Sequence, residues 1–134
     1  MTTPMICLLI TLLLPLVLAG VGGYYRSREP GGMDNNDPRG QVNKLTGPGT
    51  RAYAAQQNAW EAIALFTPAV LVAHVLGADP ATSAALAITF VGLRVVHGIC
   101  YLADLATLRS LAFVASLVCV IWLFTLGAES AALG

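Results

Sequence analysis

Residues 4–25 read PMICLLITLLLPLVLAGVGGYY and contain no charged side chain. An α-helix rises about 1.5 Å per residue, so about 20 apolar residues cross a bilayer core of roughly 30 Å. The stretch is therefore long enough to form a transmembrane helix. No Lys or Arg precedes it, and the first charged residues, Arg26 and Arg28, follow it. This order favours a retained helix over a cleaved signal peptide.

Three further apolar runs follow, over residues 52–78, 81–103 and 110–128. Glu61 and Arg94 are the only acidic or basic residues, histidine aside, inside them. Residues 26–50 are rich in Pro, Gly, Asn and Asp, which are typical of loops. The sequence predicts a single all-α domain over residues 1–134, an integral membrane bundle of four helices. The expected spans are about 4–25, 52–77, 82–103 and 109–130, with a polar loop over 26–50.

Composition supports a protein surrounded by lipid. Hydrophobic residues make up 57% of the 134 residues, and charged residues make up 10%. A soluble domain carries about 25% charged residues, so there is too little polar surface here for a globule that faces water. Seven basic and seven acidic residues balance, without the basic stripe that nucleic-acid binding needs. Cys7, Cys100 and Cys119 lie in apolar runs without metal-ligand spacing, so we expect core residues rather than a metal site or disulfides.

The placement of basic residues predicts the orientation. Loops on the cytoplasmic side of a membrane protein carry an excess of Lys and Arg. Six basic residues lie in or beside the first and third connections: Arg26, Arg28, Arg39, Lys44, Arg51 and Arg109. These two connections share one side of a four-helix bundle. We therefore expect that side to be cytoplasmic and both termini to lie on the non-cytoplasmic side.

Glu61 and Arg94 are unusual residues for membrane spans. A charge at the centre of a spanning helix costs about 2.5–3.5 kcal/mol on insertion scales. Glu61 lies ten residues beyond Arg51, and Arg94 lies ten residues before Asp104. Ten residues correspond to about 15 Å of helix, so both charges fall near the same depth. An ion pair between them is expected, either within one subunit or between subunits.

Further polar residues repeat at helical spacing around this pair, and residues three, four or seven apart share a helix face. The expected pocket, open to the cytoplasmic side, is lined by Arg51, Asn58, Glu61, Arg94, His97 and Tyr101, with Arg109 and Ser110 at its open end. A simpler interpretation is that these groups only hold helices together, because polar side chains bond across membrane helices.

Two motifs at these residues resemble those of a known family. The first is RAYAAQQNAWE at residues 51–61, followed by Phe66 and Pro68, and the second is RVVHGICY at residues 94–101, followed by Arg109 and Ser110. They are similar to the MAPEG family, the membrane-associated proteins in eicosanoid and glutathione metabolism. That family includes the microsomal glutathione transferases, leukotriene C4 synthase and microsomal prostaglandin E synthase. The similarity covers about residues 41–120, and the final turn looks most like bacterial members.

The resemblance implies a homotrimer that binds glutathione as a co-substrate, in a cleft between subunits near the cytoplasmic side. By position, Arg109 would stabilise the glutathione thiolate and Ser110 would donate a hydrogen bond to the sulfur. Arg94 and Glu61 would hold the charged ends of the peptide, and Asn58, His97 and Tyr101 would complete the lining. Several members carry an arginine where this chain has Ala54, and Arg51, one turn further out, is the candidate substitute.

Three functions stay open on this basis. The first is a glutathione-dependent transferase or peroxidase acting on lipophilic electrophiles or hydroperoxides in a bacterial inner membrane. The second is a non-catalytic, structural or accessory subunit of a larger membrane complex. The third is a small-molecule or proton pathway built on Glu61 and Arg94.

Overall fold

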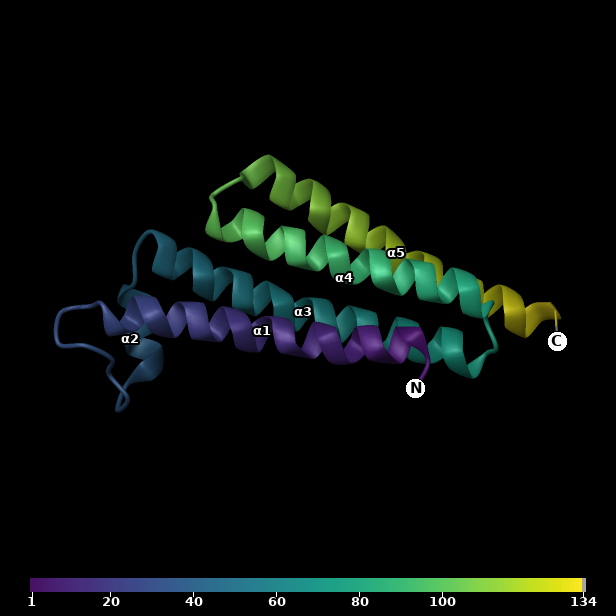
Figure 1. Ribbon diagram of the computed structural model, residues 1–134, viewed down its shortest axis with the longest axis horizontal. Coiled ribbons are helices and arrows are strands. Elements are labelled where there is room, and N and C mark those ends of the chain that lie inside the picture. The colour runs from purple at the N-terminus through teal and green to yellow at the C-terminus, as the bar shows by residue number, and fades with distance from the viewer. Residues whose placement is uncertain (134) are drawn as a thin grey trace.

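The computed structural model describes residues 1–133, and within them every regular element is helical. The elements are α1 (Thr3–Ser27), α2 (Pro38–Lys44), α3 (Pro48–Val75), α4 (Pro80–Leu102) and α5 (Ala106–Leu133). Figure 1 shows the four long helices side by side, with both ends of the chain at one end of the bundle. All four are long and apolar enough to cross a membrane. The expected all-α bundle of four spanning helices is confirmed, and the chain is an integral membrane protein.

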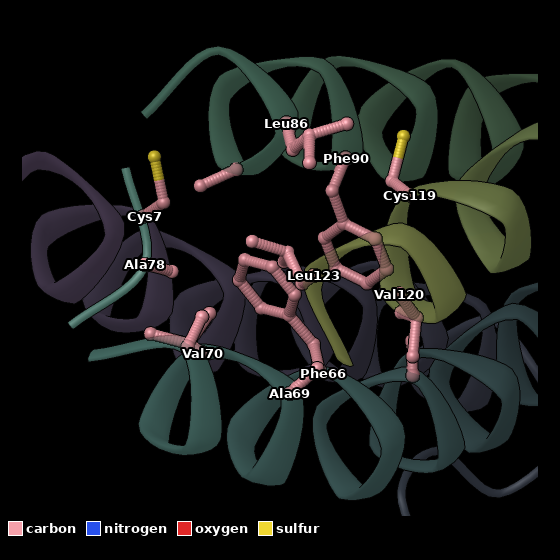
Figure 2. Close-up of a cluster of buried hydrophobic side chains, with 13 residues drawn as sticks. Cys7, Phe66, Ala69, Val70, Ala78, Leu86, Phe90, Cys119, Val120 and Leu123 are labelled. Atoms are coloured by element: carbon pink, nitrogen blue, oxygen red, sulfur yellow. The ribbon is translucent and has the colours of Figure 1, made fainter. Parts of the chain in front are cut away.

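Helices α3 and α4 form the centre of the bundle. Each of them packs against the other and against both α1 and α5. The core contains Phe66 of α3 and Phe90 of α4, whose rings stack with centroids 3.9 Å apart, and Figure 2 shows this pair beside Leu123 of α5. Leu16 of α1 and Ile121 of α5, by contrast, are more than half exposed. Large apolar side chains on the outside are what a lipid-facing surface requires.

Two tight turns set the ends of α4. Gly77, with φ 71°, ends α3, and Asp104, with φ 60°, ends α4. In each turn the next residue donates its N–H back across the helix end, from Ala78 to the Ala73 carbonyl and from Leu105 to the Cys100 carbonyl, both at 2.9 Å. These are Schellman caps, which satisfy the last carbonyls of a helix and reverse the chain within a few residues. Residues before and after each turn are thereby held on neighbouring helices.

The segment expected to be loop over residues 26–50 differs from the prediction in two places. Pro38–Lys44 forms α2, capped by the Asp37 side chain, which accepts from the Gly40 N–H at 3.0 Å. Helix α3 begins at Pro48 rather than near residue 52. Proline fits the first turn of a helix because it needs no N–H partner there, so residues that signal a loop elsewhere begin helices here.

The rest of this connection is folded onto the end of α1. The Gln41 side chain accepts from Arg26 Nε at 2.9 Å and from the Asp34 N–H at 3.0 Å, and donates to the Gly32 carbonyl at 2.7 Å. The Asp34 carboxylate accepts the backbone N–H groups of Asp37 and Asn36, which holds its pKa below the usual value. Figure 1 shows α2 set apart from the α4–α5 turn.

Candidate functional site

A hollow of about 270 Å³ lies beside the α4–α5 turn, between α3, α4 and α5. Its lining contains five of the eight residues singled out from the sequence, together with two apolar residues of α5. The lining residues are Asn58, His97, Tyr101, Arg109, Ser110, Phe113 and Val114. Residues far apart in the chain thus meet because the Schellman turn brings the start of α5 back against the end of α4.

Arg109 provides the positive charge of this hollow. Its guanidinium carbon lies 4.5 Å from the centre of the Tyr101 ring, a cation–π contact that holds the charge over the aromatic face. The Tyr101 ring packs edge-on against His97, with centroids 5.4 Å apart. Among residues 1–133 the one ion pair joins Arg51 to Asp104, so Arg109 has no carboxylate partner there. The guanidinium N–H groups are therefore available to an anionic ligand.

Arg94 is held by Asn58 and not by Glu61. Arg94 is only 4% exposed, and its Nη2 donates to the Asn58 side-chain oxygen and, at 3.2 Å, to the Asn58 backbone carbonyl. Asn58 in turn donates from Nδ2 to Glu61 Oε2 at 3.2 Å. The expected direct Glu61–Arg94 ion pair is therefore wrong within one chain. Asn58 lies one turn closer to the cytoplasmic end predicted above and faces α4, so its amide stands between the two charges.

Glu61 and Arg94 line a second, smaller hollow of about 80 Å³ next to the first. Phe113 belongs to the linings of both hollows. The Glu61 side chain itself is exposed on the outside of the single chain, within the part of α3 that spans the membrane. A carboxylate at that depth needs a polar neighbour beyond this chain or a water-filled cleft.

Two predicted site residues are placed differently from the expectation. Arg51 points to the α4–α5 turn, where its Nη1 lies 3.8 Å from Asp104 Oδ2, and not into the hollow. Position 51 is two helical turns before Asn58, roughly 10 Å along the axis, which puts it level with the turn. Ser110 lines the hollow, but its hydroxyl already donates to the Ala106 carbonyl at 3.1 Å.

Sequence reasoning missed the apolar part of this site. Phe113 and Val114 follow Arg109 and Ser110 by four residues each, so one face of α5 carries all four side chains into the hollow. That spacing could have revealed them. The result is a site with a cation and an aromatic hydroxyl at one end and lipid-exposed apolar side chains at the other. Such a site suits a polar, anionic molecule that meets a lipophilic one.

Comparison with known proteins identifies the family. The family model described as the MAPEG family matches residues 3–128, which include nearly all of the four long helices. Neither the curated proteins nor the solved structures yielded a match. The family match covers every residue of the hollow and both motifs noted in the sequence. On this basis the protein belongs to the MAPEG family.

Proposed function

We propose that this protein is a glutathione-dependent transferase or peroxidase that acts on lipophilic electrophiles or hydroperoxides within the membrane. Family membership supports a glutathione-related role in the membrane in general terms. The observation that carries the finer proposal is Arg109, an arginine held over Tyr101 at the mouth of a hollow, without a carboxylate partner in residues 1–133.

The chemistry starts with the glutathione thiol. A free thiol has a pKa of about 8.5, and a neighbouring cation lowers that value because it stabilises the thiolate. Arg109 is the candidate for this cation, and Ser110 is the candidate donor to the same sulfur, after its hydroxyl turns away from the Ala106 carbonyl. Asn58, His97 and Tyr101 would hold the rest of the tripeptide in the hollow. The thiolate is the reactive species in both reactions.

Both reactions balance without a further cofactor. In the transferase reaction the thiolate attacks an electrophilic carbon, a carbon–sulfur bond forms, and the leaving group departs with its electron pair. In the peroxidase reaction the thiolate attacks the terminal oxygen of a hydroperoxide, and the O–O bond breaks. The lipid leaves as an alcohol after it takes a proton, and the sulfur becomes a sulfenic acid. A second glutathione thiol then converts the sulfenic acid to the disulfide and water.

A trimer would complete this site. Glu61 is exposed at membrane depth and its one hydrogen-bond partner in the described residues is Asn58. A neighbouring subunit packed over α3 and α5 would cover Glu61 and close the open side of both hollows. We propose that the subunits form such a homotrimer in a bacterial inner membrane. The basic residues of the first and third connections support a cytoplasmic α4–α5 turn and termini on the other side.

The test is glutathione binding by the purified protein in detergent, followed through the ultraviolet absorbance of the thiolate. Addition of glutathione should produce the thiolate signal, and Arg109→Ala should abolish it while the oligomer persists. The matched control is Arg28→Ala, because Arg28 makes a comparable cation–π contact with Tyr24, at 5.0 Å, outside the hollow. A thiolate signal that Arg109→Ala leaves intact would exclude the proposed role of Arg109.

One observation favours a second function. Arg94 is already engaged by Asn58, and this bond joins α3 to α4 without any ligand. The same groups would serve as polar contacts in a non-catalytic subunit of a larger membrane complex. That function predicts no thiolate signal in the unmodified protein and stable co-purification with other membrane subunits.

A further inference from the structure

A groove of about 160 Å³ lies between α1, α3 and α4, away from α5. Helices α1 and α4 run in the same direction in Figure 1, and the groove follows them from Thr11 and Arg94 to Val21 and Leu102. His97 lines both this groove and the candidate site. Apart from His97, none of the lining residues takes part in the proposed glutathione chemistry.

Arg94 brings unpartnered N–H groups to this groove. The residue is only 4% exposed, and its Nη2 bonds to Asn58, whereas Nε and Nη1 make no hydrogen bond among the described residues. The fully covered, unpartnered side-chain atoms of residues 1–133 are Arg51 Nε and Ser83 Oγ, so the two Arg94 nitrogens keep some open surface. No carboxylate lies within 4.0 Å of Arg94 in this part of the chain. A buried cation with free N–H groups in a groove can donate to a ligand there.

His97 adds a second unpartnered polar side chain. It is 3% exposed, and its ring packs against the rings of Tyr101 and Phe113 but makes no hydrogen bond within residues 1–133. Neither ring nitrogen is among the fully covered atoms. A neutral imidazole has one N–H to donate. His97 follows Arg94 by three residues, so the two side chains lie on one face of α4, about one turn apart.

The rest of the lining is apolar and leaves room for a ligand. Within the described residues the lining contains no acidic side chain, and its one hydroxyl, that of Thr11, already donates to the Cys7 carbonyl at 2.8 Å. Gly98 places no side chain in the groove, and a Cβ there would lie 3.9 Å from Leu18. The apolar lining includes Leu14, Val17, Leu18, Val95, Ile99 and Leu102. The groove therefore suits a hydrocarbon molecule that carries an acceptor oxygen.

Size and depth narrow the class of ligand. An apolar cavity of about 150 Å³ holds one benzene ring, so a groove of about 160 Å³ suits a single six-membered ring. Arg94 lies ten residues before Asp104, about 15 Å inside the span, where a neutral head costs less to insert than a carboxylate. We infer that this groove binds the ring of a membrane-soluble quinone, with an Arg94 N–H donating to one ring carbonyl. The tail of the quinone would leave between α1 and α4 into the lipid.

The experiment uses the full chain in lipid nanodiscs and a benzoquinone whose decyl tail carries a diazirine next to the ring. After irradiation, mass spectrometry should map the label to peptides containing residues 11–21 and 94–102. Arg94→Leu should reduce this labelling about tenfold, the effect of one hydrogen bond to a charged group. Gly98→Leu fills the groove but leaves the Arg94–Asn58 bond in place, and it should remove the labelling. The matched control is Gly92→Leu on the same helix, where a new Cβ meets nothing within 4 Å, and labelling should be unchanged.

Competition identifies the chemistry of the ligand, and thermal unfolding measured alongside shows whether each variant keeps its fold. The unlabelled decylbenzoquinone should compete for the labelled site, and decylbenzene, which has the ring without the oxygens, should compete about tenfold less well. Label spread along the outer face of α5, or equal competition by the quinone and the hydrocarbon, would overturn the inference. So would stronger competition by decanoic acid than by the quinone. None of these outcomes requires glutathione to bind in the other hollow.

Discussion

Asn58→Ala removes the amide that joins Arg94 to Glu61, and its effect can be estimated from the geometry. Arg94 is 4% exposed, so the guanidinium loses a charged hydrogen bond that water cannot easily replace. A hydrogen bond to a charged group contributes about 1.5–3 kcal/mol. The bond to the Asn58 backbone carbonyl, at 3.2 Å, survives the substitution. We therefore expect the free energy of unfolding to fall by about 2–3 kcal/mol.

The assay is reversible unfolding of the purified protein in mixed detergent and SDS micelles. Arg94→Leu and the double variant complete a double-mutant cycle with Asn58→Ala. The two substitutions should be strongly non-additive, because removal of Arg94 also removes the buried charge that Asn58 satisfies. The double variant should therefore be more stable than the sum of the single losses predicts.

The variant Glu61→Gln distinguishes the arrangement in which Asn58 bridges Arg94 and Glu61 from the direct Glu61–Arg94 ion pair that the sequence alone suggests. Among residues 1–133 the one hydrogen bond of the Glu61 carboxylate is the one it accepts from the Asn58 amide, at 3.2 Å. The side-chain oxygen of a glutamine can accept the same bond, so the replacement should change the free energy of unfolding by less than about 1 kcal/mol. A direct pair with Arg94 would make Glu61→Gln as damaging as Asn58→Ala. Equal losses for these two variants, or additive effects of Asn58→Ala and Arg94→Leu, would refute the reasoning.

Two further predictions concern helix ends and packing. The pKa of Asp79 is lowered because its carboxylate accepts hydrogen bonds from the hydroxyl and the N–H of Thr82. The stability that this carboxylate contributes is therefore present above the usual pKa of 3.8 and is lost as pH falls through the lower pKa of the folded state. The thermal midpoint should drop on acidification, and Asp79→Asn should reduce that drop. Gly127→Ala should destabilise by about 1–3 kcal/mol in SDS unfolding, since the new Cβ would lie 3.2 Å from the Ala73 backbone, whereas Gly92→Ala meets nothing within 4 Å and should show no loss.

The spanning helices could be predicted because length and apolar content decide them. Residues 4–25 form an uncharged apolar run that is long enough to span a bilayer as a helix, and α1 includes all of them. The ends were less predictable, since Pro48 reads as a loop residue in isolation but serves as the first turn of α3. Helix α2 was missed for the same reason, because Asp37 and Pro38 signal a turn as readily as they start a helix.

The residues that line the candidate site could mostly be predicted from the sequence, but the hydrogen bonds between their side chains could not. Helical spacing places Asn58, His97 and Tyr101 on facing surfaces, and the structure brings them to one hollow. Helical spacing alone does not determine whether Asn58 or Glu61, which lie about one turn apart on α3, contacts Arg94 on the neighbouring helix. Asn58 and Glu61 differ by three positions, about 300° of rotation, and that difference aims the amide at Arg94 and the carboxylate outward.

The α4–α5 turn determines which way Arg109 faces. An α-helix rotates about 100° per residue, so one residue inserted into the first turn of α5, between Ala106 and Arg109, would carry the guanidinium more than a quarter of the way around the helix and off the Tyr101 ring. A whole extra turn would restore the direction but move the charge about 5.4 Å along the axis. The number of residues from the start of α5 to Arg109 is therefore as specific a requirement as any side chain, and natural variation in this first turn should appear as substitutions and not as insertions or deletions.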